Sequence, residues 1–225
     1  MSLQLLEREI RRIHVIDDDP DVRGAYLEYV KDMDIEGIDV AHSISDIDSF
    51  FKTIDGDHDG IICDYQLTGR KYSSVNGDVY GKAAYERKIP FLLSSHFQPL
   101  SLYGQRRFIP KAVAADDFSA EAIKDAFVLC LQEFKGSYSA YRQPIRTLVR
   151  IEGIQPFGAS YQLNVVVPNW NPHVGVQIVI EASQIPSFDQ IRSDLDSQGE
   201  ARLLAEVNTG AEAASELFFT DWRPL

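Results

Sequence analysis

Cysteine is nearly absent from this sequence, with two residues in 225. Cys63 and Cys130 lie inside apolar stretches, and their spacing matches no metal-binding motif. We therefore expect both to be small buried side chains in a reducing compartment. This excludes a disulfide-stabilised secreted scaffold and disfavours a cysteine nucleophile.

Long apolar runs are missing as well. Nowhere do 18 apolar residues follow one another, so no transmembrane helix is expected. The first twelve residues are charged and lack the apolar core of a signal peptide. Together these features favour a cytoplasmic protein.

Basic residues are scarce relative to acidic ones. Lys and Arg total 22 and Asp and Glu total 34, which gives a net charge of −12. This balance disfavours a protein that works by neutralising nucleic-acid phosphates, and it equally disfavours adhesion to an anionic membrane. The length predicts one large or two small domains.

Residues 12–135 alternate short apolar runs with helical patterns. Strands are predicted at 13–16, 38–40, 61–63, 91–93 and 108–109, and helices at 20–33, 44–54, 77–88 and 123–134. Strands that read as continuous apolar runs are buried on both faces. The pattern predicts an α/β fold with a doubly wound, five-stranded parallel sheet.

The pattern changes after Gly136. Residues 137–145 have the composition of a linker, which follows a first domain at 1–136. Runs rich in Val, Ile, Tyr and Phe then centre on 146–152, 160–168, 174–182, 201–208 and 214–222. They predict a small all-β sandwich or barrel over 146–225, with one short helix within 185–198.

Acidic side chains stand at two predicted strand ends of the first domain. Asp17 and Asp18 end the first strand, and Asp64 ends the third. The carboxyl ends of these strands meet near the topological switch point, where such sheets bind ligands. Three neighbouring carboxylates repel unless a cation neutralises them, and Mg²⁺ is the natural candidate. Ser95 and Lys111, after the fourth and fifth strands, could hold the oxygens of a phosphoryl group.

The stretches that carry these residues are Val15–Pro20, Ile61–Gly69, Pro90–Ser95 and Phe108–Lys111. In this order they resemble the receiver domain of bacterial two-component response regulators, over roughly residues 10–136. The resemblance implies a flavodoxin-like, CheY-like fold and a phosphoprotein that works in phosphorelay signal transduction. Its partner would be a sensor histidine kinase or a phosphotransfer protein, and no enzymatic activity is expected beyond transfer to its own aspartate.

The resemblance also implies roles at the acidic end of the sheet. Asp64 would be the phosphoacceptor. Mg²⁺ would be held by Asp18, Asp64 and the backbone carbonyl of Gln66, and Asp17 would act through a bound water.

Three further positions match the family. Ser95 would hydrogen-bond the phosphoryl group, with Ser94 as the alternative at this position, and Lys111 would pair with it. Phe108 would be the aromatic switch that moves inward on activation.

The sequence departs from the family at three points. Ala112 follows Lys111 where the family usually has proline, and His96 follows Ser95 where a small residue is usual. The spacing of sixteen residues from Ser95 to Lys111 leaves little room for a full helix. The surface through which many receivers dimerise is therefore expected to be altered.

A second acidic motif lies just upstream of Asp64. Residues 55–60 match the start of a calcium-binding EF-hand loop, but position twelve is Gln66 and not the glutamate that such loops require. We therefore interpret this segment as a solvated loop that leads into the third strand.

The second domain lacks the features of a DNA-binding domain or of an enzyme. Residues 145–225 hold five Arg, no Lys and ten acidic residues. They carry one histidine, His173, which we interpret as a surface residue, and no nucleophile or phosphate-binding motif. Trp170, in a loop rich in Pro and Asn, could anchor a protein partner or cap the β core.

By elimination we favour an interaction or oligomerisation module that the receiver controls. DNA binding and an unrecognised enzymatic output are the alternatives.

Overall fold

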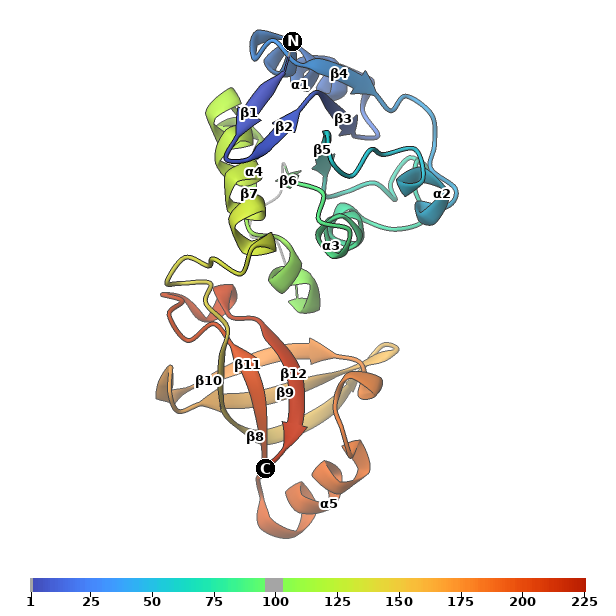
Figure 1. Cartoon of the computed structure of the whole chain (residues 1–225). Coiled ribbons are helices and arrows are strands. Elements are labelled where there is room, and N and C mark those ends of the chain that lie inside the picture. Colours follow the sequence, from blue (N-terminus) through green and yellow to red (C-terminus); the bar gives the residue numbers. More distant parts are fainter. Residues whose placement is uncertain (1, 96–102) are drawn as a thin grey trace. The chain divides into compact units, whose positions relative to one another are not determined.

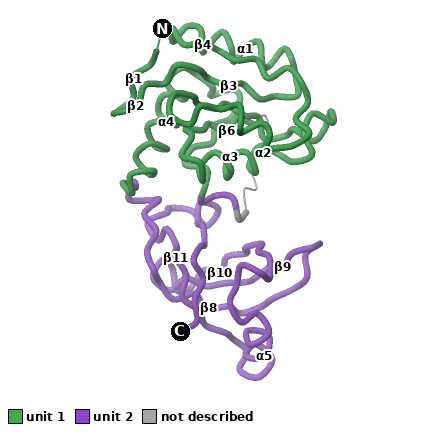
Figure 2. Tube along the Cα trace, turned by 45° about the vertical axis from the view of Figure 1, so that its right-hand side comes forward, with its two compact units in different colours: residues 1–101, 108–137 green, residues 102–107, 138–225 purple. Residues whose placement is uncertain are grey.

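The computed structural model describes residues 2–95 and 103–225, which form two compact units (Figure 2). The first unit contains the described residues up to 95 and Phe108–Ser137. The second contains residues 103–107 together with Tyr138–Leu225. The short segment at 103–107 is therefore separated in sequence from the rest of its unit.

A five-stranded parallel sheet forms the centre of the first unit (Figure 1). The strands, in spatial order, are β4 (Glu36–Asp39), β3 (Arg12–Ile16), β5 (Asp59–Asp64), β6 (Phe91–Ser95) and β7 (Ala112–Ala114). This is the order of a doubly wound sheet: β4 lies on one side of β3, and the later strands are added on the other side, so that the topological switch point lies between β3 and β5. Every residue of β5 and β6 is buried, which explains their continuous apolar sequences.

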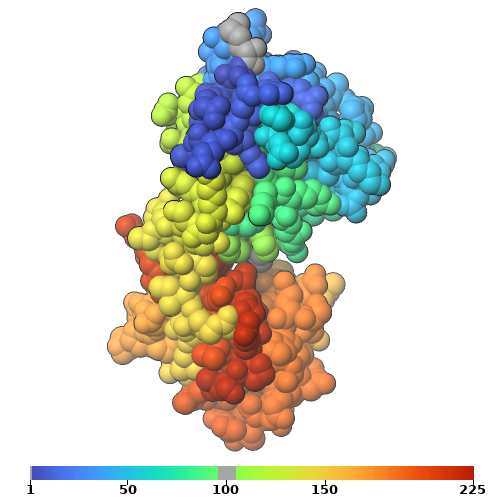
Figure 3. Space-filling view, viewed as in Figure 1, coloured from blue at the N-terminus to red at the C-terminus, as the bar shows by residue number. Residues whose placement is uncertain are grey.

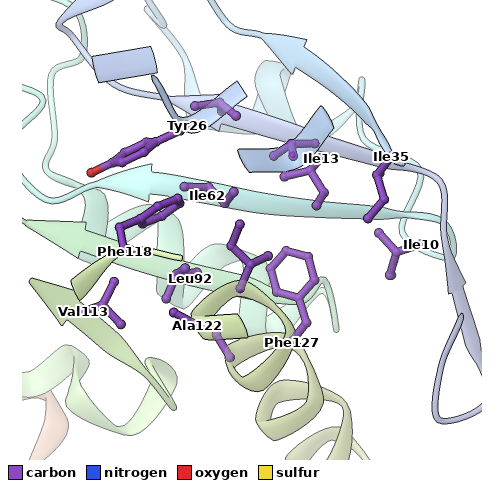
Figure 4. Close-up of a cluster of buried hydrophobic side chains, with 14 of the residues drawn as sticks. Ile10, Ile13, Tyr26, Ile35, Ile62, Leu92, Val113, Phe118, Ala122 and Phe127 are labelled. Atoms are coloured by element: carbon purple, nitrogen blue, oxygen red, sulfur yellow. The ribbon is translucent and has the colours of Figure 1, made fainter. Parts of the chain in front are cut away.

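Helices cover both faces of this sheet. On one face, α1 (Pro20–Asp32) and α4 (Ala120–Phe134) pack their apolar stripes against the strands, and Figure 4 shows Tyr26 of α1 and Phe127 of α4 in that core with Ile62 and Leu92. On the other face lie α2 (Ile47–Phe51) and α3 (Gly77–Glu86), where Phe50 of α2 contacts Tyr80 of α3. Within the described residues, no helix combines the length and the apolar character needed to cross a membrane.

An N-terminal hairpin adds to this fold and was not predicted. Its strands are β1 (Leu3–Leu5) and β2 (Arg8–Ile10), which pair antiparallel. Leu5 and Ile10 are buried in the same core as Phe127. Figure 3 shows the hairpin, in the darkest blue, next to the yellow-green α4.

The prediction of the fifth strand at 108–109 is wrong. The strand that pairs with β6 is β7, at Ala112–Ala114, and Phe108 ends a 3₁₀ turn, η1 (Tyr103–Phe108). Ile109 is buried because its side chain packs against Gly81 of α3. The apolar character of this dipeptide thus reflects contact with a helix. A second 3₁₀ turn, η2 (Ala115–Asp117), leads from β7 towards α4.

The second unit is built on one antiparallel sheet. Its spatial order is β10 (Asn171–Ile180), β9 (Ser160–Val167), β8 (Ile145–Phe157), β11 (Ala201–Val207) and β12 (Phe219–Pro224). The helix α5 (Phe188–Gln198) buries Ile191 in the core of this unit, and the turns η3 (Ala182–Gln184) and η4 (Ala214–Glu216) connect strands.

A β domain with a short helix is therefore present, but the predicted sandwich or barrel is not. The described strands form a single sheet in which β10 and β12 are the edges. Leu163, Val165 and Val167, which alternate along β9, are fully buried in its core.

Arg142 explains why residues 103–107 belong to the second unit. Its guanidinium donates hydrogen bonds to the carbonyls of Arg106 (3.4 Å) and Arg107 (2.9 Å). The guanidinium carbons of Arg107 and Arg142 each lie 5.4 Å from the ring centroid of Phe218. Tyr141, within the predicted linker, also accepts a hydrogen bond from Asn208 through its carbonyl. Residues 138–145, which form most of the predicted linker, thus belong to the second unit.

Candidate functional site

The three aspartates predicted to converge do so. Asp17 and Asp18 directly follow β3, and Asp64 is the last residue of β5. Each offers one carboxylate oxygen, and these oxygens all lie within 4.8 Å of one another. Because β3 and β5 flank the topological switch point, the cluster occupies the place where this architecture binds ligands.

Backbone hydrogen bonds orient two of the carboxylates. The Asp19 amide donates to Asp17 Oδ1 and the Gln66 amide donates to Asp64 Oδ2, each at 2.7 Å. Both bonds close tight turns at strand ends, which is why an aspartate suits these positions. The carboxylates are therefore held by the backbone of the turns that follow their strands.

Burial makes Asp17 costly to ionise. Asp17 is 3% exposed and Asp64 is 7% exposed. Burial, together with the charges of Asp64, Asp18 and Asp19, raises the pKa of Asp17 to about 7 against the hydrogen bond from Asp19. A bound divalent cation would remove this repulsion.

The donor set fits Mg²⁺. Three carboxylates within bonding reach of one ion, with neither a sulfur nor a nitrogen donor in the group, match the oxygen ligands that this hard cation prefers. The role of the Gln66 carbonyl as a further ligand stays a prediction.

Both candidate serines lie at the end of β6. Ser94 is in register with Asp64, and its hydroxyl forms a 2.7 Å hydrogen bond with the Tyr26 hydroxyl. Ser95 is the last residue of the strand, is 1% exposed, and pairs in register with Ala114 of β7. Which of the two contacts a phosphoryl group stays a prediction, and His96 lies outside the described residues.

Lys111 does not follow the fifth strand, contrary to the prediction. It precedes β7, and its ammonium forms a 2.9 Å ion pair with Asp125 of α4. Ala114 occupies the place beside Ser95 where the lysine was expected. The error arises because the fifth strand was predicted at 108–109, which would end just before Lys111. The observed strand, at Ala112–Ala114, begins just after Lys111.

Phe108 is also not on a strand. It is half-buried at the end of η1, with its ring 5.8 Å from that of Tyr85 and 5.5 Å from the ammonium of Lys82. Its role as a switch is untested.

Two arginines at the cluster were missed by the sequence analysis. Arg23 is buried and donates a 2.7 Å hydrogen bond to the carbonyl of Asp17. Arg70 approaches from the loop after β5 and forms a 2.9 Å ion pair with Asp19. Neither belongs to an apolar pattern or a motif, so only the folded chain brings them to the cluster.

Asp59 of the EF-hand-like segment has a structural role. Its fully buried carboxylate accepts two 2.8 Å hydrogen bonds from Arg12 and lies 2.9 Å from His14 Nε2. These contacts fix the amino end of β5 and agree with the interpretation of a loop that leads into a strand.

In the second unit, Trp170 is half-buried against the β core, and its indole donates a 2.7 Å hydrogen bond to the Ala211 carbonyl. Of the two alternatives for this residue, the structure shows the one in which it caps the core. His173 is exposed, as expected.

Comparison with known proteins finds likeness in structure alone. No protein-family model matches the chain, and no curated protein is similar to it in sequence. A response regulator of Thermotoga maritima in complex with Mg(2+)-BeF is 15% identical, with a TM-score of 0.39, over 52% of this chain and 95% of its own. A receiver domain from Clostridium thermocellum is 11% identical, with a TM-score of 0.43, over 56% and 98%.

A third similar structure is Vibrio cholerae chemotaxis protein CheY4, which is 14% identical, with a TM-score of 0.38, over 57% of this chain and 98% of its own. Values this low establish no family. The case for a function therefore rests on the side chains of the cluster.

Proposed function

We propose that the first unit is a receiver domain that accepts a phosphoryl group on Asp64 with Mg²⁺, and that the protein is a response regulator of a phosphorelay. The observation that carries this proposal is the convergence of Asp17, Asp18 and Asp64 at the switch point, with ligand oxygens within 4.8 Å of one another. The same three residues stand in the motifs that resemble the receiver family.

Asp64 is the nucleophile in this proposal. One of its carboxylate oxygens forms a bond to phosphorus while the bond between phosphorus and the donor's leaving group breaks, which leaves an acyl phosphate on Asp64. The Gln66 amide holds Asp64 Oδ2 and thereby orients the carboxylate. A serine hydroxyl at the end of β6 would hydrogen-bond the transferred group.

Asp18 and Asp64, with the Gln66 carbonyl, would hold Mg²⁺, and Asp17 would act through a bound water. Bound there, Mg²⁺ supplies the positive charge that lets an anionic phosphoryl group approach a carboxylate. The donor would be a sensor histidine kinase or a phosphotransfer protein.

The second unit is proposed to mediate protein interaction or self-association under control of the receiver. Its acidic composition supports a protein partner over DNA. Its sheet presents two edges, β10 and β12, to which no described strand is paired on the outer side, and unpaired edges are where another chain can add a strand.

Labelling with a small radioactive phosphodonor tests the first proposal. The wild type should incorporate label only with Mg²⁺ present, and Asp64→Asn should incorporate none. Asp57→Asn, which changes an exposed aspartate of the preceding loop, is the matched control and should label like the wild type. Label retained by Asp64→Asn would refute the acceptor assignment.

Size-exclusion chromatography with and without beryllofluoride, a phosphate mimic, tests the second proposal. A change in assembly that requires Asp64 is expected. An unchanged elution volume under saturating beryllofluoride would contradict control of self-association.

A further inference from the structure

Among the described residues, β7 places no cationic side chain beside Ser95 at the carboxyl end of the sheet. Lys111 precedes β7 and is paired with Asp125, and Ala114 stands beside Ser95. An acyl phosphate adds negative charge to a cluster that already holds three carboxylates. A cationic side chain from another element is therefore needed close to Asp64.

Arg70 reaches the cluster from the loop after β5. Its Nη2 lies 2.9 Å from Asp19 Oδ2, and its Nε lies 3.9 Å from Asp18 Oδ2. Its Nη1 also donates a 3.4 Å hydrogen bond to the carbonyl of Asp18. Asp18 belongs to the cluster, and one of its carboxylate oxygens lies within 4.8 Å of one from Asp64, so the guanidinium lies beside the carboxylates that surround Asp64.

The loop that carries Arg70 is anchored on both sides of it. Leu67 is fully buried, and its carbonyl accepts a hydrogen bond from the Ser73 amide. The Tyr72 hydroxyl donates to the carbonyl of Val40. Gly69 lies beside Asp18, since a Cβ built on it would be in van der Waals contact with Asp18 Oδ2, at 3.8 Å. These contacts thus fix the backbone position of Arg70.

We infer that Arg70 is the cationic residue that contacts the phosphoryl oxygens on Asp64, and that Asp19 is its positioning residue. This inference rests on the proposed function. The planar guanidinium can donate two parallel hydrogen bonds to a phosphoryl group. If Asp18 bound a metal ion, the 2.9 Å pair with Asp19 would still hold Arg70 beside the cluster.

Isothermal titration calorimetry of the full chain, with Mg²⁺ alone and with beryllofluoride at saturating Mg²⁺, separates the possible roles of this arginine. Arg70→Ala should bind beryllofluoride about tenfold or more weakly, as for the loss of one charge-assisted contact. Its affinity for Mg²⁺ alone should be unchanged or higher, because a competing cation has been removed. Arg70→Lys should retain part of the beryllofluoride affinity.

Two further variants sharpen the test. Asp19→Asn keeps an oxygen for the N-cap of α1 and removes the charge that holds Arg70, so it should lose part of the beryllofluoride affinity. Arg11→Ala removes an exposed arginine that is paired with Glu9 and should bind like the wild type.

If Arg70→Ala binds beryllofluoride as tightly as the wild type, or more tightly, the inference is overturned, and Arg70 is only a cation that competes with the metal. A wild type that binds neither Mg²⁺ nor beryllofluoride would overturn the proposed function itself.

Discussion

At the scale of single residues, the cluster places three carboxyl groups close together, where their negative charges repel one another. Asp17 is nearly fully buried beside two other carboxylates, and its pKa is raised to about 7. A carboxyl group with a raised pKa binds its proton more tightly in the folded chain than in the unfolded chain. The contribution of Asp17 to the free energy of unfolding of the metal-free protein therefore decreases as the pH rises from about 4 to about 7, and stays lower above it.

This pH dependence is testable with Asp17→Asn. The amide keeps an oxygen for the Asp19 amide and cannot ionise. Denaturation in EDTA should show the wild type losing roughly 3–4 kcal/mol relative to the variant between pH 4.5 and pH 8, at about 1.4 kcal/mol for each unit of pKa shift. Saturating Mg²⁺ should abolish much of that loss. Parallel pH profiles of the two proteins in EDTA would show that Asp17 ionises normally.

Lys111 was predicted to lie at the site, but it precedes β7 and is paired with Asp125. Because its ammonium pairs with Asp125, Lys111→Ala should bind beryllofluoride with the affinity of the wild type and lose less than about 1 kcal/mol of stability. Calorimetry and urea denaturation measure both quantities. A beryllofluoride affinity lowered tenfold would instead place the lysine at the phosphoryl group.

The acidic residues could be predicted from the sequence, whereas the basic ones could not. Asp17, Asp18 and Asp64 directly end apolar runs, and the ends of parallel strands must meet. Arg70 and Lys111 lie in loops or beside a short strand, where no periodicity specifies a position. The ion pairs of their long side chains depend on which acidic residues the fold brings close to them.

At the scale of elements, the packing of α3 against the end of β5 positions Asp64. A Cβ built on Gly77, the first residue of α3, would lie 2.1 Å from the Asp64 carbonyl oxygen. The Gly77 amide also donates a 2.8 Å hydrogen bond to the carbonyl of Tyr65. The absence of a side chain at Gly77 is what lets the helix begin so close to the strand.

Gly77→Ala should therefore destabilise the protein by about 1–3 kcal/mol and weaken Mg²⁺ binding, although alanine favours helices. Gly24→Ala is the matched control, since a Cβ on Gly24 of α1 has no neighbour within 4 Å. That change should raise stability by roughly 0.5–1 kcal/mol. Thermal denaturation and Mg²⁺ titration of the two variants measure both effects, and equal stabilisation would argue against the close approach.

The sequence predicted an element correctly where its apolar residues are buried in the sheet or on one face of a helix. It predicted an element wrongly where the apolar residues, as at Phe108 and Ile109, pack against a helix from outside a strand. The long runs of β3, β5 and β6 and the stripe of α4 are recognisable because each is packed along its whole length. β7 has three residues, two of them alanine, and its signal is weaker than that of Phe108 and Ile109. The β1–β2 hairpin is equally short.

At the scale of the whole molecule, the second unit is not a continuous piece of chain. Residues 103–107 enter it from between β6 and β7 and are held by Arg142 and Phe218. No sequence pattern could reveal that residues 103–107 belong to the second unit, because this depends on contacts between residues about 35 and 110 positions apart. It also means that a fragment beginning at Tyr138 lacks part of its own unit.

Arg142→Ala should destabilise the second unit by about 2–4 kcal/mol, because the carbonyls of Arg106 and Arg107 lose their donor and Phe218 loses a stacked guanidinium. Urea denaturation followed by tryptophan fluorescence reports this unit alone, since Trp170 and Trp222 both lie in it. Arg192→Ala, on the exposed side of α5, should change stability by less than about 0.5 kcal/mol. Equal effects of the two substitutions would contradict the role given to Arg142.

The most direct test of the central claim is tandem mass spectrometry of the full chain after incubation with acetyl phosphate and Mg²⁺. We expect one phosphoryl group per chain, located on Asp64, and none when Mg²⁺ is removed by EDTA. A phosphoryl group on another residue, or an unmodified Asp64 in protein that demonstrably binds Mg²⁺, would contradict it.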